Sequence, residues 1–365
     1  MYYKCLSEQT FIHGNFLSHS TFLTEKTINQ METVDSKINK FEQQKKKKDF
    51  DKSNVLITSI SKKVALLKQV REAAEKLGTI DKIYGGDVNN KCIGLYFVDK
   101  FWKMPELEDL KIDQLINYCK DNNIKYIIPS RDGELAYFAQ HKELLCANDI
   151  YVMVSSPPSI NVTLDKYLFA KELKRLGYPV IPTALDMKEI DSPSLVVKER
   201  YGAGSRNIGI NLDREEAVQH ALSLNNPIYQ PYIKGEEYSV DLYVTSKKKT
   251  KGVIVRKRDV IVNGESQITT TIRNEGLEEI CAALAEDLNL FGHIVMQVII
   301  DQKENYHIIE VNARFGGASH LSIKAGLDSF YWFFLESSGH NIDVYPFIRN
   351  KEELKLIRYP EDLII

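Results

Sequence analysis

The chain has 365 residues, of which 43% are hydrophobic and 27% are charged, enough apolar material for two or three packed domains. This composition excludes an intrinsically disordered chain and a collagen-like chain. The 48 basic and 50 acidic residues give a formal net charge of −2, so no basic excess is available to neutralise a phosphate backbone. We therefore do not expect nucleic acid as a partner.

No segment has the roughly 18 to 20 consecutive apolar residues of a membrane span, and MYYKCLSEQTFIHGN at the start lacks the apolar region of a signal peptide. The five cysteines are scattered and never in C-x-x-C spacing, which disfavours a disulfide framework and a zinc site. We expect a cytoplasmic protein without a membrane partner. The cysteines are Cys5, Cys92, Cys119, Cys146 and Cys281.

Residues 1–53 differ from the rest of the chain. They are polar, include a helix-like stretch over Thr24–Gln44, and end shortly after four successive lysines, Lys45–Lys48. Because like charges repel and stay solvated, we expect an N-terminal extension and lysine-rich linker.

Apolar segments alternate with amphipathic segments over residues 54–158, which predicts a parallel sheet with helices on its faces. No G-x-G-x-x-G follows the first strand, so a nicotinamide site is not expected. Asp132 precedes the last helix, where an N-cap role is favoured over binding of a substrate amine. The expected strands are 54–60, 82–84, 94–97 and 124–129, and the expected helices are 64–78, 112–122 and one that starts near residue 132.

Residues 159–365 begin with a predicted helix over Asp165–Leu176 and continue with strands rich in Val, Ile and Tyr. One further helix is expected over Gly276–Leu290. These segments predict two sheet-rich lobes. The expected strands are SLVVKER, PIYQPYI, EYSVDLYV, GVIVRKRDVIV, IVMQVIID and YHIIEVNA.

The segment Ile294–Gly317 carries the strongest chemical signal. Side chains alternate along a strand, so Glu310 and Asn312 share a face, and Arg314 follows if the strand continues. Gln297 interrupts an apolar run in the preceding strand, which is costly unless its amide finds a partner. Three oxygen donors that converge from adjacent strands suit Mg²⁺. The alternative is an edge strand with an exposed Glu and a hydrogen-bonded core Gln.

Two further segments are informative only in combination. The strand that carries Lys198 enters a loop with Gly202, Gly204, Ser205 and Gly209, which suits phosphate contacts but also a flexible hairpin. The segment IYQPYIKGEEYSV contains Pro231 and a Lys-Gly turn, so it suits either a connector that contacts adenine or an ordinary β-hairpin.

The order of these features, a lysine, a glycine loop, Gly-x-Glu-Tyr, Gln and then Glu-x-Asn-x-Arg, resembles the ATP-grasp superfamily. The chain is most similar to single-module relatives of the carbamoyl-phosphate synthase large subunit, from Asn54 to Gly326 and including IIPSRDGEL. The resemblance implies an α/β (α+β) class: a small parallel-sheet pre-ATP-grasp domain over 54–158 and an ATP-grasp domain over 159–365. Within the latter it implies a small lid lobe at about 180–230 and a core lobe at about 231–345.

The resemblance also implies the site residues. It assigns phosphate contacts to Lys166 and Lys198 and to the loop with Gly202, Gly204 and Ser205. It assigns adenine contacts to Gln230, Tyr232 and Ile233, the ribose to Glu237, metal ligation to Gln297, Glu310 and Asn312, and the transferred phosphate to Arg314. The implied cofactors are ATP and Mg²⁺, with Mn²⁺ as an alternative. Gln297 stands where an acid is common in the superfamily, which should weaken the metal site without removing it.

The implied activity is an ATP-dependent carboxylate-amine (or carboxylate-thiol) ligase that forms an acylphosphate, ADP and phosphate from small-molecule substrates. Phosphorylation of bicarbonate or carbamate and a non-catalytic ATP-binding regulator remain alternatives, and a homo-oligomer is left open. Arg256 and Arg258 share a strand face, and either could neutralise the intermediate or form a solvated face. We prefer Arg256 slightly.

Overall fold

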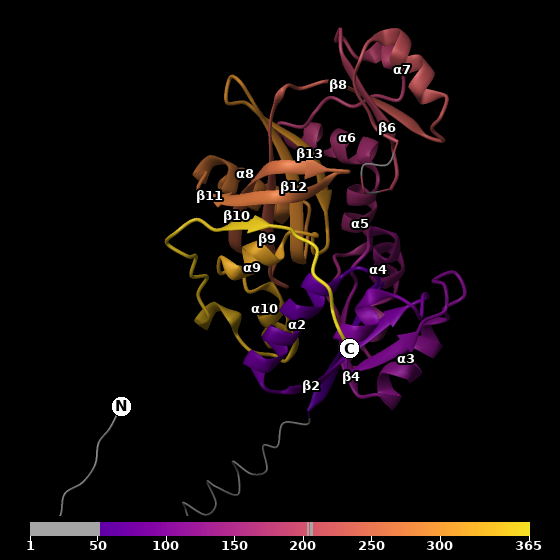
Figure 1. Ribbon diagram of the computed structural model, residues 1–365, viewed down its shortest axis with the longest axis vertical. Coiled ribbons are helices and arrows are strands. Elements are labelled where there is room, and N and C mark those ends of the chain that lie inside the picture. The colour runs from indigo at the N-terminus through magenta and orange to yellow at the C-terminus, as the bar shows by residue number, and fades with distance from the viewer. Residues whose placement is uncertain (1–51, 203, 205–206) are drawn as a thin grey trace, which may run out of the picture. The chain divides into compact units, whose positions relative to one another are not determined.

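Three β-sheets organise the part of the chain that the structure, a computed structural model, describes, namely residues 52–202, 204 and 207–365 (Figure 1). The expected extension 1–53, apart from Lys52 and Ser53, lies outside these residues, as does the helix-like stretch Thr24–Gln44.

The first sheet, here called the N-terminal sheet, is parallel throughout, as the sequence predicts. All six residues of its central strand β1 are buried, which is typical of a parallel strand covered on both faces. Its strand order is β3-β2-β1-β4-β5. The strands are β1 (Ser53–Thr58), β2 (Ile80–Asp87), β3 (Lys100–Lys103), β4 (Ile124–Ile128) and β5 (Tyr151–Val152), and the helices are α2 (Val64–Leu77), α3 (Ile112–Asp121) and α4 (Asp132–Cys146).

The strand expected at 94–97 is wrong, because Ile93–Phe97 forms a short 3₁₀ helix, η1. Gly94 lies so close to the loop after β1 that a Cβ atom would come within 2.6 Å of the Ile60 carbonyl oxygen. The glycine therefore permits a close backbone approach, and the neighbouring edge strand is β3 instead.

The second sheet, here called the core sheet, is antiparallel and has the order β13-β12-β9-β10-β11-β14. Helix α8 packs against β9 and β10, and α10 packs against both β12 and α2. The strands are β9 (Gly235–Val244), β10 (Thr250–Val262), β11 (Glu265–Ile272), β12 (Gly292–Asp301), β13 (Tyr306–Asn312) and β14 (Lys355–Ile357); the helices are α8 (Glu275–Asp287), α9 (His320–Lys324), α10 (Ser329–Ser337) and the short η3 (Ile342–Val344).

The third sheet, here called the lid sheet, has three antiparallel strands in the order β7-β6-β8. Figure 1 shows it with α7 at one end of the part of the chain that the structure describes. The strands are β6 (Leu195–Glu199), β7 (Gly209–Leu212) and β8 (Pro227–Pro231); helix α7 is Arg214–Ala221, and α5 (Pro157–Leu164), α6 (Lys166–Leu176) and η2 (Met187–Glu189) precede the sheet.

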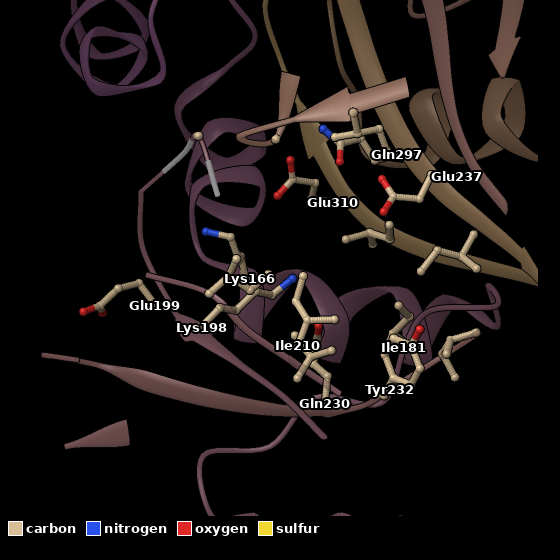
Figure 2. Close-up of a pocket in the computed structure, with 18 of the residues that line it drawn as sticks. Lys166, Ile181, Lys198, Glu199, Ile210, Gln230, Tyr232, Glu237, Gln297 and Glu310 are labelled. Atoms are coloured by element: carbon tan, nitrogen blue, oxygen red, sulfur yellow. The ribbon is translucent and has the colours of Figure 1, made fainter. Parts of the chain in front are cut away.

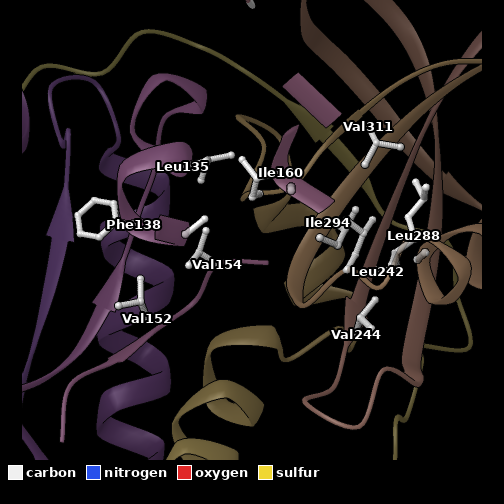
Figure 3. Close-up of a cluster of buried hydrophobic side chains, with 14 of the residues drawn as sticks. Leu135, Phe138, Val152, Val154, Ile160, Leu242, Val244, Leu288, Ile294 and Val311 are labelled. Atoms are coloured by element: carbon white, nitrogen blue, oxygen red, sulfur yellow. The ribbon is translucent and has the colours of Figure 1, made fainter. Parts of the chain in front are cut away.

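One apolar cluster joins the N-terminal sheet to the core sheet (Figure 3). Its members include Phe138 on α4, Ile160 on α5 and Leu242 on β9, each at most 1% exposed. A second cluster packs α2 against the aromatic helix α10. The two sheets therefore share buried apolar surface, which fixes the loops of one against the strands of the other.

None of the helices in the described ranges has the length and apolar character needed to cross a bilayer.

Candidate active site

A cavity of about 730 Å³ lies between the lid sheet and the core sheet (Figure 2). This volume lies in the range of ligand sites that hold a cofactor or drug-sized molecule. Ten of the site residues expected from the sequence line it: Lys166, Lys198, Gly202, Gly204, Gln230, Tyr232, Ile233, Glu237, Gln297 and Glu310. Ser205 lies outside the described residues.

Lys166 and Lys198 approach the cavity from the lid side. Asp165 starts α6 by accepting the backbone N–H groups of Tyr167 and Leu168, which places Lys166 on the first turn. The Lys166 ammonium donates to the Gly202 carbonyl at 2.6 Å. Lys198 on β6 is buried, and burial lowers its pKa to about 8, with a further contribution from Lys166. Two cations that line the same cavity favour an anionic ligand.

The loop after β6 requires glycine at two positions. Gly202 and Gly204 have φ values of +96° and +82°, a conformation that other residues rarely adopt. Before the loop, the Glu199 carboxylate accepts the backbone N–H groups of Asn225 and Asn226 at 2.7 and 3.0 Å. The loop therefore begins at a strand end that two hydrogen bonds hold in place. The backbone of the loop can approach a phosphate closely.

The segment after β8 forms the other end of the cavity. The Gln230 side chain donates to the Thr183 hydroxyl at 2.8 Å, and the Tyr232 N–H donates to the Ser194 carbonyl at 2.9 Å. The Tyr232 N–H and one of the two N–H groups of the Gln230 amide are therefore engaged within the protein. Six isoleucines that sequence reasoning did not single out add apolar walls on which a flat ring could lie: Ile181, Ile208, Ile210, Ile261, Ile299 and Ile309.

Gln297 and Glu310 line the cavity from the core sheet. They are direct partners across β12 and β13, so both side chains point to the same side of the sheet. Asn312 follows on the same face and donates to the Glu310 carboxylate at 3.1 Å. The residues described contain no cluster of three His, Cys, Asp or Glu side chains. Gln297 and Glu310 line the cavity, whereas Asn312 is not part of its lining. One carboxylate and two amides share this face, and their oxygen atoms fit Mg²⁺ better than a transition metal.

Arg314 continues the row beyond the cavity, toward the N-terminal sheet. Its guanidinium donates to the Asn312 side chain at 3.1 Å and pairs with Asp132 at 2.6 Å. Asp132 is the first residue of α4 and Arg131 is its N-cap, so the expected N-cap role of Asp132 is wrong. The Asp132 carboxylate holds the arginine instead. Sequence reasoning could not find this pair, because its members are 182 residues apart.

The two candidate arginines on β10 lie in different surroundings. Arg258 lines the cavity and pairs with Glu237 at 2.6 Å. Arg256 is buried outside the cavity lining and pairs with Asp241 at 2.5 Å. The structure thus places Arg258, rather than the preferred Arg256, at the cavity. The pair with Arg258 also means that the Glu237 carboxylate is already engaged by a cation.

Two family models match the chain. Residues 163–318 match the family described as "ATP-grasp domain", and residues 55–153 match the family described as "PylC-like, N-terminal domain". Among curated proteins, the carbamoyl phosphate synthase large chain of Pyrococcus furiosus is 23% identical over 209 residues, which are 50% of this chain and 20% of that protein. The chain thus spans about a fifth of the length of this relative.

Solved structures share the fold. The biotin carboxylase domain of Hydrogenobacter thermophilus 2-oxoglutarate carboxylase, described as a dimer with MgADP, ADP and bicarbonate, has a TM-score of 0.66 and 18% identity, over 83% of this chain and 73% of that one. The N5-carboxyaminoimidazole synthetase of Staphylococcus aureus with ADP has a TM-score of 0.63 and 16% identity, over 80% of each chain. The predicted fold class and family resemblance are confirmed, and the relatives are ATP-dependent enzymes.

Proposed function

We propose that the protein is an ATP-dependent carboxylate-amine (or carboxylate-thiol) ligase that acts through an acylphosphate, and the match of residues 163–318 to the ATP-grasp domain family supports this. The observation that carries this proposal is the arrangement of the cavity. Two lysines on the lid side face a carboxylate and an amide on the core side, in a space large enough for a nucleotide (Figure 2).

The proposed reaction has two steps. A carboxylate oxygen of the substrate forms a bond to the γ-phosphorus of ATP, and the bond from that phosphorus to the bridging oxygen breaks, which gives an acylphosphate and ADP. An amine or thiol then attacks the acyl carbon, phosphate leaves with its electron pair, and the nucleophile loses a proton. The protein mainly positions the reactants and neutralises the charge on the phosphate oxygens.

The lid-side cations would hold the phosphates of ATP. The Lys198 ammonium has no ion pair among the described residues and is buried beside the cavity, so a phosphate oxygen would supply its missing partner. Lys166 would exchange its bond to the Gly202 carbonyl for a phosphate contact. Arg314, fixed by Asp132, would stabilise the phosphoryl group during transfer.

Glu310, Gln297 and Asn312 would hold Mg²⁺, because their oxygen atoms lie on one face of two paired strands. When bound there, Mg²⁺ supplies positive charge against the phosphate oxygens of ATP.

Phosphorylation of bicarbonate or carbamate is a second candidate. It is favoured by the similarity to the biotin carboxylase domain whose structure contains bicarbonate with MgADP. A non-catalytic ATP-binding regulator is less well supported, because a sensor has no need of Arg314 in a hydrogen-bonded row with Asn312 and Glu310.

The proposal is tested by measuring ADP and phosphate formation from ATP and Mg²⁺ with a panel of small carboxylates, amino acids and bicarbonate, each with and without ammonia or an amine. We expect that one carboxylate stimulates ADP formation. Stimulation by bicarbonate alone would favour the second candidate, and absence of stimulation by every compound would contradict both.

A further inference from the structure

A buried polar network lies in the core sheet, outside the lining of the cavity. Its centre is Asp241 on β9, which is 0% exposed. The Asp241 carboxylate pairs with the Arg256 guanidinium at 2.5 Å and contacts the His293 ring at 3.1 Å. It also accepts the hydroxyl groups of Ser319 and Ser322. None of these five residues lines the cavity, so contact with a nucleotide does not account for them.

Stability alone does not account for this network either. Burial by itself would raise the pKa of Asp241, but Arg256 and His293 hold it well below its usual range, so the carboxylate is charged inside the protein. The Nη1 atom of Arg256 is also buried, and no partner for it exists among the described residues. A buried ion pair often stabilises a fold no more than apolar side chains of the same volume would. What the network can supply is a fixed position for the groups bonded to it.

One hydroxyl of the network connects it to the turn that follows Arg314. The N–H group of Gly316 donates to Ser319 Oγ at 3.0 Å, and the Ser319 hydroxyl donates to Asp241. Because a hydroxyl has one hydrogen, its donation to Asp241 leaves the lone pairs of the oxygen for Gly316. The Ser319 N–H donates back to the Gly316 carbonyl at 3.1 Å. The backbone two residues after Arg314 is therefore bonded to a buried, charged group.

The residue between Arg314 and Gly316 is held by the same network. Phe315 is buried, and its ring packs against the His293 ring with the centroids 4.9 Å apart. The two ring nitrogens of His293 contact Asp241 and, at 2.8 Å, the Ser329 hydroxyl, which fixes the ring. The Arg314 guanidinium donates to the Phe315 carbonyl at 3.2 Å. Arg314 is thus bonded to a backbone segment that the network holds at two successive residues.

We propose that Asp241 and Ser319 are positioning residues, which hold Arg314 in the orientation that phosphoryl transfer requires. The inference rests on the proposed function, in which Arg314 stabilises the phosphoryl group during transfer. Asp132 holds the guanidinium from the N-terminal sheet, and the network holds the backbone after it from the core sheet. Catalysis is sensitive to such placement, because a displacement of about 1 Å can lower a rate about 100-fold.

Ser322 provides a matched comparison for Ser319. Both side chains are 0% exposed, and both hydroxyls donate to Asp241, Ser319 to Oδ1 and Ser322 to Oδ2. Of the two, Ser319 also accepts the Gly316 N–H. If the network only stabilises the fold, loss of either hydroxyl should have the same result. If the network positions Arg314, loss of the Ser319 hydroxyl alone should impair catalysis.

The test compares the full-length wild type, Ser319→Ala and Ser322→Ala. The measurements are kcat and KM for ATP with the carboxylate that best stimulates ADP formation, MgADP affinity by calorimetry, and amide hydrogen exchange in peptides that span residues 312–320. In Ser319→Ala we expect kcat to fall roughly 10- to 100-fold, with unchanged KM for ATP, unchanged MgADP affinity and faster exchange in this segment. Ser322→Ala should keep the kcat and the exchange of the wild type. Both variants should lose melting temperature to a similar extent.

Ser319→Cys keeps the size of the side chain but donates and accepts weakly, so it should show the same pattern to a smaller extent and replaces Ser319→Ala if that variant does not fold. A wild-type kcat in Ser319→Ala, or an equal loss of kcat in both alanine variants, would overturn the inference and keep the ligase. A wild type that forms no ADP with any compound would contradict the ligase and with it the positioning role. Faster exchange in Ser319→Ala alone would then show only that the hydroxyl anchors the turn.

Discussion

The two walls of the cavity differ in the size of the apolar core that supports them. The core wall belongs to a six-stranded sheet whose buried side chains continue into the N-terminal domain. The lid wall belongs to a three-stranded sheet that is supported by a separate cluster of five buried apolar side chains: Ala184, Ile190, Leu195, Val197 and Ala217. Because local stability follows the buried apolar contacts, the lid wall should open at a lower free energy than the core wall.

The walls also differ in charge. Lysines come from the lid side, and oxygen donors come from the core side. A nucleotide with bound Mg²⁺ would join the two, because its phosphates attract the lysines and its metal attracts the oxygens. Substitutions in the core wall should therefore abolish turnover while the protein remains folded. Substitutions in the lid wall should mainly weaken nucleotide binding.

Glu310→Ala should have the largest effect, because it removes the one carboxylate of the proposed metal set. We expect turnover to fall by roughly 1,000-fold or more, the upper range for loss of one transition-state stabilising group. The apo protein should melt as the wild type does. Phosphate release across a magnesium titration is the measurement, and Glu279→Ala, an exposed carboxylate on α8, is the control. Near-normal turnover that requires the same magnesium concentration as the wild type would contradict the metal assignment.

Lys198→Ala should have the next largest effect. A charged hydrogen bond to phosphate contributes about 1.5 to 3 kcal/mol, which corresponds to roughly 10- to 150-fold in kcat/KM. Stability should be maintained, because burial of an unpaired ammonium is itself costly. The measurement is kcat/KM for ATP from steady-state kinetics at varied ATP concentration. The matched control is Lys171→Ala, which changes an exposed lysine on α6. Equal kcat/KM in both variants would place Lys198 outside the phosphate site.

The pH dependence of ADP binding should give a smaller effect. The pKa of Lys198 is lowered from its ordinary 10.5 to about 8, mainly by burial. The charged lysine is lost as pH rises through about 8, so ADP affinity should fall above that pH by up to about tenfold per pH unit. Calorimetry from pH 7 to 9.5 tests this, and the decrease should be absent in Lys198→Ala. A pH-independent wild type would contradict the lowered pKa.

The lowered pKa of Lys198 also makes the free energy of unfolding depend on pH. Between about pH 8 and 10.5 the unfolded state binds more protons at Lys198 than the folded state does. Its unfavourable contribution to stability is therefore fully present below pH 8 and is relieved as pH rises toward 10.5.

Two leucine substitutions compare the supporting cores directly and should give the smallest effect on activity. Leu195 on β6 and Leu242 on β9 are both 0% exposed, and Leu→Ala at such sites costs about 2 to 5 kcal/mol. Leu242→Ala should lower the global melting temperature. Leu195→Ala should leave it nearly unchanged but weaken ADP binding, roughly tenfold for each ~1.4 kcal/mol by which the folded lid is disfavoured. Equal loss of melting temperature in both would show that the lid is not a separate unit.

The sequence predicted the parts of the site that depend on local patterns. Alternation along one strand placed Glu310 and Asn312 on one face, and the glycine loop followed Lys198 directly. Alternation could not separate Arg256 from Arg258, because residues two apart share a face. What separates them is the buried Asp241, a partner from another strand.

Contacts between distant segments could not be predicted in this way. Asp132 and Arg314 meet because two sheets share a core, and no local pattern marks them. The helix α10 was also missed, since SFYWFFLES is apolar on all sides and lacks the helical period. Its burial against α2 supplies the reason for that composition.

The most direct test of the central claim follows one oxygen atom. The carboxylate that stimulates ADP formation is labelled with ¹⁸O and incubated with ATP, Mg²⁺ and the nucleophile, and the released phosphate is analysed by mass spectrometry alongside chromatography of the nucleotides. The account predicts ADP as the nucleotide product and one ¹⁸O atom in the phosphate, because the carboxylate oxygen that attacks the γ-phosphorus leaves with it. Unlabelled phosphate, or AMP as the main nucleotide product, would contradict the acylphosphate mechanism.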